Sequence, residues 1–214
     1  GREPISCRLV FDLLKTAGAD RIMSVDLHAA QSQGFFDGPV DHLIAMPVLV
    51  DYIRDRFSNQ LDNVAVVSPD AGRIRVAEQW AQRLGGGPLA FVHKTRDITR
   101  PNQAVANRVV GDVAGKDCVL VDDLIDTAGT IAGACNVLKD AGAKSVTVVA
   151  THGVLSGPAV DRLKNCGARE VVLTDTVPIP EEKRWDGLTV LSIAPLLASA
   201  IRAVFEDGSV AELF

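Results

Sequence analysis

Carboxylates and hydroxyls gather in one short segment near the middle of this sequence. Residues 119–130 read Val-Leu-Val-Asp-Asp-Leu-Ile-Asp-Thr-Ala-Gly-Thr, which is an apolar run, an acidic pair and a turn of small residues. Backbone N–H groups of such a turn, at the start of a helix, form an anion cradle, to which Thr127 and Thr130 add hydroxyl donors. Asp122 and Asp123 suit sugar hydroxyls or the waters of a bound metal. An Asp-rich turn with a threonine helix cap is the purely structural alternative.

Other predicted strands also end in polar residues. The six strand ends are Asp26-Leu27-His28, Ser68-Pro69-Asp70, His93-Lys94, Asp122-Asp123, Thr151-His152 and Thr174-Asp175, and four of them carry a carboxylate. Open α/β sheets bind ligands beyond the carboxyl ends of their strands. The pattern therefore predicts a functional site at that edge of the sheet.

Two of these strand ends carry candidate metal ligands. His28 follows Asp26, and an imidazole there suits a metal or a nucleotide phosphate, although a lone histidine is more often structural. Asp70 begins the turn Asp70-Ala71-Gly72-Arg73, where its carboxylate suits magnesium and the N–H groups of the turn suit phosphate oxygens. A simple turn with a helix cap explains Asp70 equally well.

A third strand end leads into a cationic segment. Residues 93–102 read His-Lys-Thr-Arg-Asp-Ile-Thr-Arg-Pro-Asn, with three Lys or Arg residues and no helical period. Such a charge run is as often a solvated loop as a ligand clamp.

The elements that must position these residues alternate regularly along the chain. Apolar runs predict strands, and 3.6-residue periodicity predicts helices between them. The predicted strands are 21–26, 64–68, 89–94, 118–122, 145–151 and 170–174, and the predicted helices are 5–17, 47–57, 74–84, 130–141, 158–165 and 195–205. Because several strands are apolar throughout, helices should cover both faces of a mostly parallel, doubly wound sheet.

Composition excludes several classes of function. The 214 residues are 47% hydrophobic and 23% charged, as in ordinary globular proteins, and the net charge of −5 argues against nucleic-acid binding. No apolar run approaches the roughly 18 residues of a membrane helix, and no signal segment is recognisable. We therefore expect a cytoplasmic protein that binds neither nucleic acid nor membrane.

Two motifs resemble a known family. Residues 119–130 resemble the phosphoribosyl-diphosphate loop shared by phosphoribosyltransferases and diphosphokinases of type I fold. Residues 26–41, Asp-Leu-His-Ala-Ala-Gln-Ser-Gln-Gly-Phe-Phe-Asp-Gly-Pro-Val-Asp, resemble the ribose-phosphate diphosphokinase signature that transferases lack, departing mainly at Ser32. Arg73 also departs from the glycine that is common at its position in the family. The resemblance spans nearly the whole chain and implies a type I phosphoribosyltransferase-like α/β fold.

The resemblance implies transfer of the diphosphoryl group of ATP to the 1-hydroxyl of ribose 5-phosphate, giving phosphoribosyl diphosphate and AMP. In the family, the region matching 93–102 is a catalytic flap whose lysine and arginine bind the triphosphate. The resemblance therefore implies this role for Lys94 and Arg96. The metal would be Mg²⁺, held at His28 and Asp70. The ribose 5-phosphate site would comprise Arg96, Asp122, Asp123, Asp126, Thr127, Ala128, Gly129 and Thr130.

The family's usual chain is longer at its amino end, which implies a truncated chain here. We expect residues 1–45 to be a remnant of the amino-terminal domain, 46–190 the catalytic domain, and 191–214 a segment returning to the first domain. Such a fragment would turn over poorly. The family also implies a homo-oligomer, a hexamer built of dimers, with phosphate and ADP as effectors.

Two alternatives stay open at this point. A phosphoribosyltransferase would share residues 119–130, but the 26–41 segment and Lys94 with Arg96 argue against it. A non-catalytic regulatory or truncated subunit of the synthetase would share every motif, and the intact Lys94, Arg96, Asp122 and Asp126 argue against this second alternative.

Overall fold

The protein, a computed structural model that describes residues 5–95 and 106–213, divides into two compact units. One unit contains residues 46–193, and the other combines residues 1–45 with 194–214. None of the described helices combines the length and apolarity needed to cross a bilayer. The two units are described separately below.

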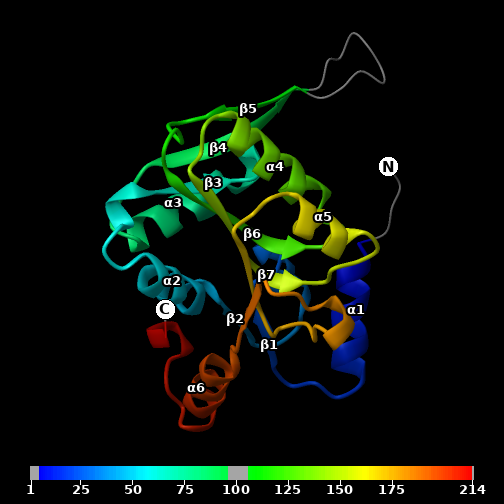
Figure 1. The fold of residues 1–214 in the computed structure, drawn as a ribbon. Helices are drawn as coiled ribbons and strands as arrows, with labels where there is room; N and C mark the ends of the chain where they lie inside the picture. Colours follow the sequence, from blue (N-terminus) through cyan, green and yellow to red (C-terminus); the bar gives the residue numbers. More distant parts are fainter. Residues whose placement is uncertain (1–4, 96–105, 214) are drawn as a thin grey trace. The chain divides into compact units, whose positions relative to one another are not determined.

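The larger unit is built on a sheet whose described strands number seven (Figure 1). Its order is β5-β4-β3-β6-β7-β8-β9, and β5 alone among these strands runs antiparallel to its neighbour. The strands are β3 (Val64–Ser68), β4 (Leu89–Thr95), β5 (Ala106–Val110), β6 (Asp117–Ile125), β7 (Ser145–Gly153), β8 (Glu170–Thr174) and β9 (Leu188–Leu191). The predicted mostly parallel sheet is confirmed.

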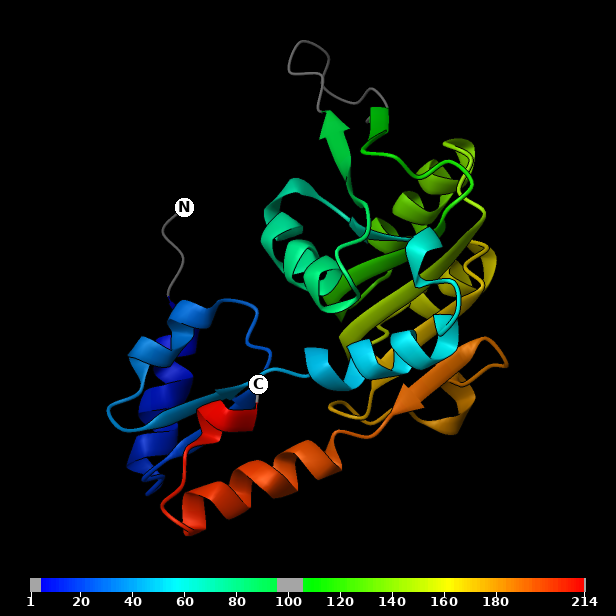
Figure 2. The ribbon, with the colours of Figure 1, turned by 90° about the vertical axis from the view of Figure 1, so that its left-hand side faces the viewer.

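Helices cover both faces of this sheet because the central strands are apolar on both sides. The helices are α2 (Met46–Phe57), α3 (Ile74–Arg83), α4 (Gly129–Asp140) and α5 (Ala159–Asn165), with 3₁₀ turns at η2 (Leu61–Asn63), η3 (Ala71–Arg73) and η4 (Glu181–Lys183). Cys118 and Leu120 of β6 share a core with α4 and α5. Val119 and Val121, also buried, alternate to the other face. Figure 2 shows these layers from the side.

Three short strands were absent from the predicted elements. β2 (Val40–Leu43) and β9 each have four residues, too few to show a clear period, and β9 lies at a sheet edge. β5, at the opposite edge, reads Ala-Asn-Arg-Val-Val and has polar residues where a central strand would be apolar. Edge strands need only one neighbour, and their sequences are correspondingly less apolar.

The smaller unit contains a two-stranded parallel sheet of β1 (Ile22–Val25) and β2. It also holds α1 (Ser6–Thr16), η1 (Ala30–Phe35), α6 (Ala194–Phe205) and η5 (Val210–Leu213). Phe11 of α1 and Phe36 are both buried, with ring centroids 6.1 Å apart. The Lys15 ammonium lies 5.5 Å from the Phe36 ring centroid. This aromatic pair forms the contact between α1 and the segment after η1.

A partly buried glutamate connects α2 to the edge of the larger sheet. Glu170 Oε1 accepts hydrogen bonds from the Tyr52 hydroxyl at 2.5 Å and from Thr189 Oγ1 at 2.6 Å. Arg56 Nε donates to Glu170 Oε2 at 3.3 Å. Burial and the hydrogen bond to Glu170 both raise the pKa of Tyr52.

We expect Tyr52→Phe to lower the free energy of unfolding by about 1 kcal/mol, because Glu170 loses one of its donors and keeps two. Urea unfolding at pH 7 measures this change. In a Glu170→Gln background the cost of Tyr52→Phe should become smaller, since the hydrogen bond to a charged acceptor is already gone. An equal cost in both backgrounds would contradict the assignment.

Candidate functional site

The segment singled out first in the sequence connects β6 to α4 in the larger unit. Its residues surround a cavity of about 160 Å³ at the carboxyl end of β6. The lining residues are Asp122, Leu124, Ile125, Asp126, Thr127, Ala128, Gly129, Thr130 and Ile131. Six of the seven residues of the 122–130 region that were predicted to bind ribose 5-phosphate therefore lie around one cavity, and Asp123 is the exception.

The backbone of this loop is fixed by donors from elsewhere in the unit. The carbonyl of Ile125 accepts from the N–H groups of Val154 and Leu155, at 3.0 and 3.1 Å, and that of Asp126 from Ser156 at 3.0 Å. The carbonyls of such a loop are therefore occupied. At the start of α4 the first N–H groups have no acceptor within the helix, and such a helix start is a common binding place for anions.

Ala128 has a left-handed conformation, with φ of +58°. A residue other than glycine adopts this region only when its surroundings impose it, and Ala128 is 4% exposed within the main core. A left-handed residue directly before a helix produces the kind of concave array of N–H groups that binds anions. The backbone of this loop therefore has a conformation that suits an anion.

Asp122, which lines this cavity, has a strongly shifted pKa. Burial, reinforced by the neighbouring Asp123 carboxylate, raises the pKa of Asp122 to about 7. The Asp123 N–H donates to Asp122 Oδ1 at 2.9 Å. A carboxyl group whose pKa is about 7 is partly protonated at neutral pH. It can therefore both donate and accept hydrogen bonds, which suits contact with a sugar hydroxyl.

Asp123 makes a contact that the sequence did not reveal. Its carboxylate forms an ion pair with Arg73, in η3 after β3, and both side chains are largely shielded from solvent. The two residues are fifty positions apart, so no local pattern could have paired them. Arg73 therefore connects the turn after β3 to the acidic pair of β6.

Asp70 begins the turn that contains Arg73. Its Oδ1 accepts from the Gly72 N–H at 2.8 Å, and its backbone carbonyl accepts from Ser68 Oγ at 2.6 Å. The side chain thus caps η3, which is the structural alternative considered for it. This bond holds Asp70 Oδ1 in place.

The cationic segment lies partly outside the described residues. Lys94 belongs to β4 and pairs with Asn107 of β5 in the antiparallel ladder. Arg96, the second cation assigned to catalysis, lies outside the described residues.

In the smaller unit, Asp26 and His28 follow β1 as predicted. Asp26 has φ of +42°, and its Oδ2 accepts from the Ala45 N–H at 3.1 Å. His42, which belongs to no motif in the sequence, accepts a hydrogen bond from the Leu27 N–H through Nε2 at 2.9 Å, and its Nδ1 lies 3.2 Å from Gln33 Nε2. His42 therefore orders the segment that carries His28.

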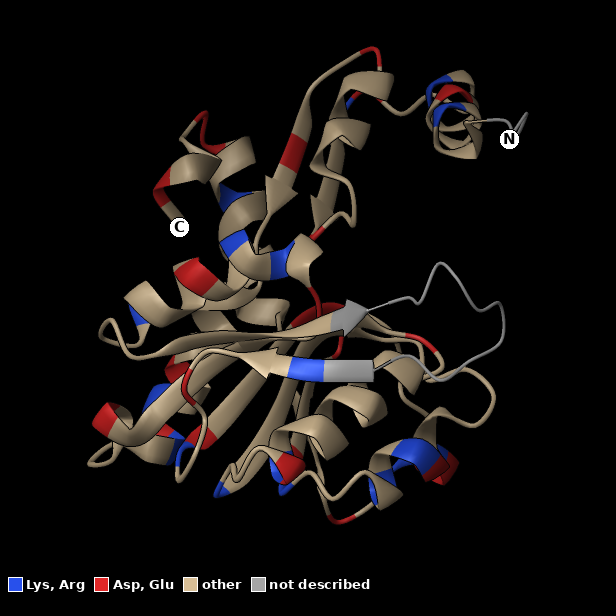
Figure 3. Cartoon of the chain, turned by 90° about the horizontal axis from the view of Figure 1, so that it is seen from above, with Lys and Arg blue, Asp and Glu red and all other residues tan. Residues whose placement is uncertain are grey.

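No group of three or more His, Cys, Asp or Glu side chains among residues 5–95 and 106–213 is arranged to hold a metal. Magnesium commonly keeps several waters and uses only one or two protein carboxylates. Along the described helices, strands and loops, the Lys and Arg positions alternate with Asp and Glu positions in Figure 3.

Comparison with known proteins identifies close relatives. Residues 95–214 match the model of the phosphoribosyl synthetase-associated domain. The whole chain is 97% identical to a "Ribose-phosphate pyrophosphokinase" of Bifidobacterium longum and 66% identical to one of Corynebacterium efficiens, of which it covers 63% and 65%. The chain thus spans less than two thirds of these relatives.

A solved structure agrees with these matches. The crystal structure of phosphoribosylpyrophosphate synthetase from Mycobacterium smegmatis superimposes with a TM-score of 0.89 at 64% sequence identity. The match covers 97% of this chain and 66% of that one.

Proposed function

The chain belongs to the phosphoribosyl synthetase family, and from this premise we propose that it is the catalytic part of a ribose-phosphate diphosphokinase. The reaction transfers the diphosphoryl group of ATP to the 1-hydroxyl of ribose 5-phosphate, which gives phosphoribosyl diphosphate and AMP. The observation that carries the proposal is the 97% identity, over all 214 residues, to a relative named for this activity.

The 5-phosphate of the sugar would bind in the cradle formed by Asp126, Thr127, Ala128, Gly129 and Thr130. Support comes from the shared cavity and from the left-handed Ala128, which turns the backbone into the start of α4. The exposed Asp126 and Thr130 leave the cradle accessible to a ligand.

The ribose ring would then extend toward the carboxyl end of β6, where Asp122 lines the same cavity. We assign hydroxyl contacts to Asp122 and Asp123. Arg73 neutralises Asp123 and so reduces the repulsion between that carboxylate and an anionic sugar phosphate.

Lys94 and Arg96 would clamp the triphosphate as the β-phosphorus is attacked. Phosphoryl transfer requires positioning and neutralisation of charge rather than a nucleophilic side chain, and cations supply both. Arg96 would also contact ribose 5-phosphate.

We assign magnesium contacts to Asp70 in the larger unit and to His28 in the smaller one, each completed by phosphate oxygens and waters. Asp70 fits this role because its carboxylate is already fixed by the Gly72 N–H, whereas the imidazole nitrogen of His28 is a less usual ligand for a hard cation. When bound, the metal would neutralise the charge of the triphosphate.

The wider assignments follow the family. We propose that residues 1–45 are part of an amino-terminal domain, that 46–190 form the catalytic domain, and that 191–214 return to the first domain. The grouping of 194–214 with 1–45 supports this division. We also propose that the protein forms a homo-oligomer, a hexamer as in the family, and that it is cytoplasmic. Phosphate and ADP would regulate it.

One assay tests the proposed function directly. The chain is incubated with ATP, Mg²⁺ and ribose 5-phosphate, and both AMP and phosphoribosyl diphosphate are quantified. We expect the two products in equal amounts, and neither when ribose replaces ribose 5-phosphate. Consumption of phosphoribosyl diphosphate with a nucleobase, without AMP formation from ATP, would instead identify a phosphoribosyltransferase.

Low turnover of this chain would require a second measurement. Ribose 5-phosphate binding by calorimetry reports on the 122–130 site without requiring turnover. A chain that neither binds ribose 5-phosphate nor forms AMP, alone or extended to the length of its relatives, would refute the proposal.

A further inference from the structure

The carbonyl groups of the phosphate cradle are held by the segment that follows β7. Backbone N–H groups of residues 154–156 hold the carbonyls of Ile125 and Asp126, and the Ala132 N–H holds that of Ala128 within α4. The remaining carbonyl, that of Thr127, accepts from a side chain instead. The donor is Arg162 Nη1 of α5, at 2.9 Å.

Arg162 lies directly against the loop but does not line its cavity. A Cβ atom added to Gly129 would be 3.5 Å from Arg162 Nη1, so the guanidinium lies beside Gly129 as well as Thr127. Arg162 is absent from the residues around the cavity. Since α4 and α5 pack together, as Figure 1 shows, α5 provides a fixed base for this contact.

The direction of this hydrogen bond determines the direction of the next N–H group. The peptide bond is planar and trans, so the Thr127 carbonyl and the Ala128 N–H point in opposite directions. A carbonyl drawn toward Arg162, outside the cavity, therefore directs the Ala128 N–H toward the other side of the loop. The left-handed φ of Ala128 then turns the chain from this peptide into the start of α4.

We propose that Arg162 is a positioning residue for the 5-phosphate site: it holds the Thr127–Ala128 peptide so that the N–H group faces the anion. This inference rests on the proposed function and adds a residue outside the motifs that suggested it. The guanidinium also places a positive charge behind the cradle, which favours an anion in it.

The test compares variants of Arg162 by their affinity for ribose 5-phosphate, measured by calorimetry at fixed ionic strength. Arg162→Met keeps most of the stem length and removes the donor and the charge. We expect it to raise the Kd for ribose 5-phosphate about tenfold. Arg162→Lys, which keeps a cationic donor, should recover at least part of the affinity.

The matched control is Lys164→Met, which removes a positive charge from the exposed surface of the same helix. It should leave the Kd within about twofold of the original value, because salt and solvent screen the charge of an exposed side chain. The KM for ATP should stay unchanged in Arg162→Met, which a general loss of structure would not allow. The melting temperature of each variant reports on folding.

The outcomes separate this inference from the proposed function. An unmodified chain that does not bind ribose 5-phosphate would refute both. Binding by the unmodified chain that Arg162→Met leaves unaltered, or that Lys164→Met weakens equally, would refute the role of Arg162 alone.

Discussion

Lys94→Ala should lower the rate of AMP formation about a thousandfold, because a cation that neutralises charge on the transferring group commonly contributes that much. Its affinity for ribose 5-phosphate should change little. Strand β3 lies between β4, which carries Lys94, and β6, which leads into the proposed phosphate cradle. About 10 Å therefore separates the two strands.

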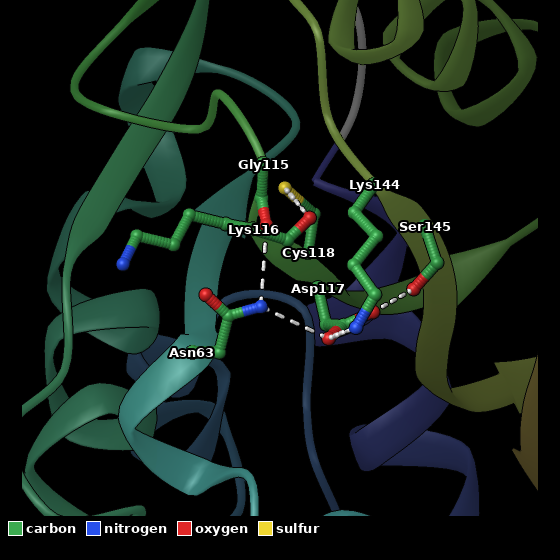
Figure 4. Close-up of polar contacts among 7 residues, drawn as sticks. All are labelled: Asn63, Gly115, Lys116, Asp117, Cys118, Lys144 and Ser145. Carbon is green, nitrogen blue, oxygen red and sulfur yellow. Dashed lines mark hydrogen bonds and ion pairs between the residues drawn. The ribbon is translucent and has the colours of Figure 1, made fainter.

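Steady-state kinetics and calorimetry on the same preparations distinguish these two effects. Lys94→Arg should retain part of the rate, since a guanidinium also binds phosphate oxygens. Lys116→Ala is the control: Lys116 precedes β6 at the amino-terminal edge of the sheet, and its side chain points away from Asp117 in Figure 4. A rate that survives Lys94→Ala unchanged would remove Lys94 from the mechanism.

The sequence predicted the central part of the fold because its signals there are local. Continuous apolar runs such as Val64–Ser68 and Glu170–Thr174 match observed strands at both ends. Strands β5 and β9 were not predicted because both lie at edges of the sheet. An edge strand pairs with one neighbour and needs no continuous apolar run of its own. The parallel pairing of β1 with β2 was likewise set by tertiary contacts.

Part of the candidate site was also predictable. Residues 126–130 are contiguous, so their types and order indicate a strand, a turn and a helix start that together form an anion site. The contacts that define the rest are distant in sequence: Arg73 pairs with Asp123, and Arg162 holds the Thr127 carbonyl. The raised pKa of Asp122 depends on burial, which a linear pattern does not report.

A buried carboxylate at the opposite end of the sheet provides the second prediction. Asp117 is 1% exposed and begins β6, in register with Val64 of β3 and Ser145 of β7. Its carboxylate accepts from Ser145 Oγ at 2.7 Å, from Lys144 Nζ at 2.8 Å and from Asn63 Nδ2 at 3.2 Å (Figure 4). These bonds join three neighbouring strands at their amino ends.

Asp117 therefore fixes the register that the site requires. A shift of one residue in β6 would exchange its two faces and move Asp122 away from the cavity. Burial alone would raise the pKa of Asp117, but the hydrogen bonds from Lys144, Ser145 and Asn63 lower it below the ordinary value. The charged form is thus the stable one in the folded protein.

We expect Asp117→Asn to lower the free energy of unfolding at pH 7 by about 3 kcal/mol, because an amide nitrogen would face donors that need an acceptor. Lys144→Met should cost less, about 1 kcal/mol or below, since the Lys144 side chain is 55% exposed and solvent screens the ion pair. Urea unfolding measures both, with Asp140→Asn, an exposed carboxylate at the end of α4, as control.

The pH dependence tests whether charge or shape causes the loss. A lowered pKa in the folded state stabilises the protein fully above the unfolded pKa, which is about 4, and this contribution disappears as pH falls through the folded value. The difference between the original chain and Asp117→Asn should therefore be constant from pH 7 to 5 and shrink below about pH 4. A difference that stays constant down to pH 2, where the native fold persists, would show that Asp117 acts through packing rather than as a buried anion.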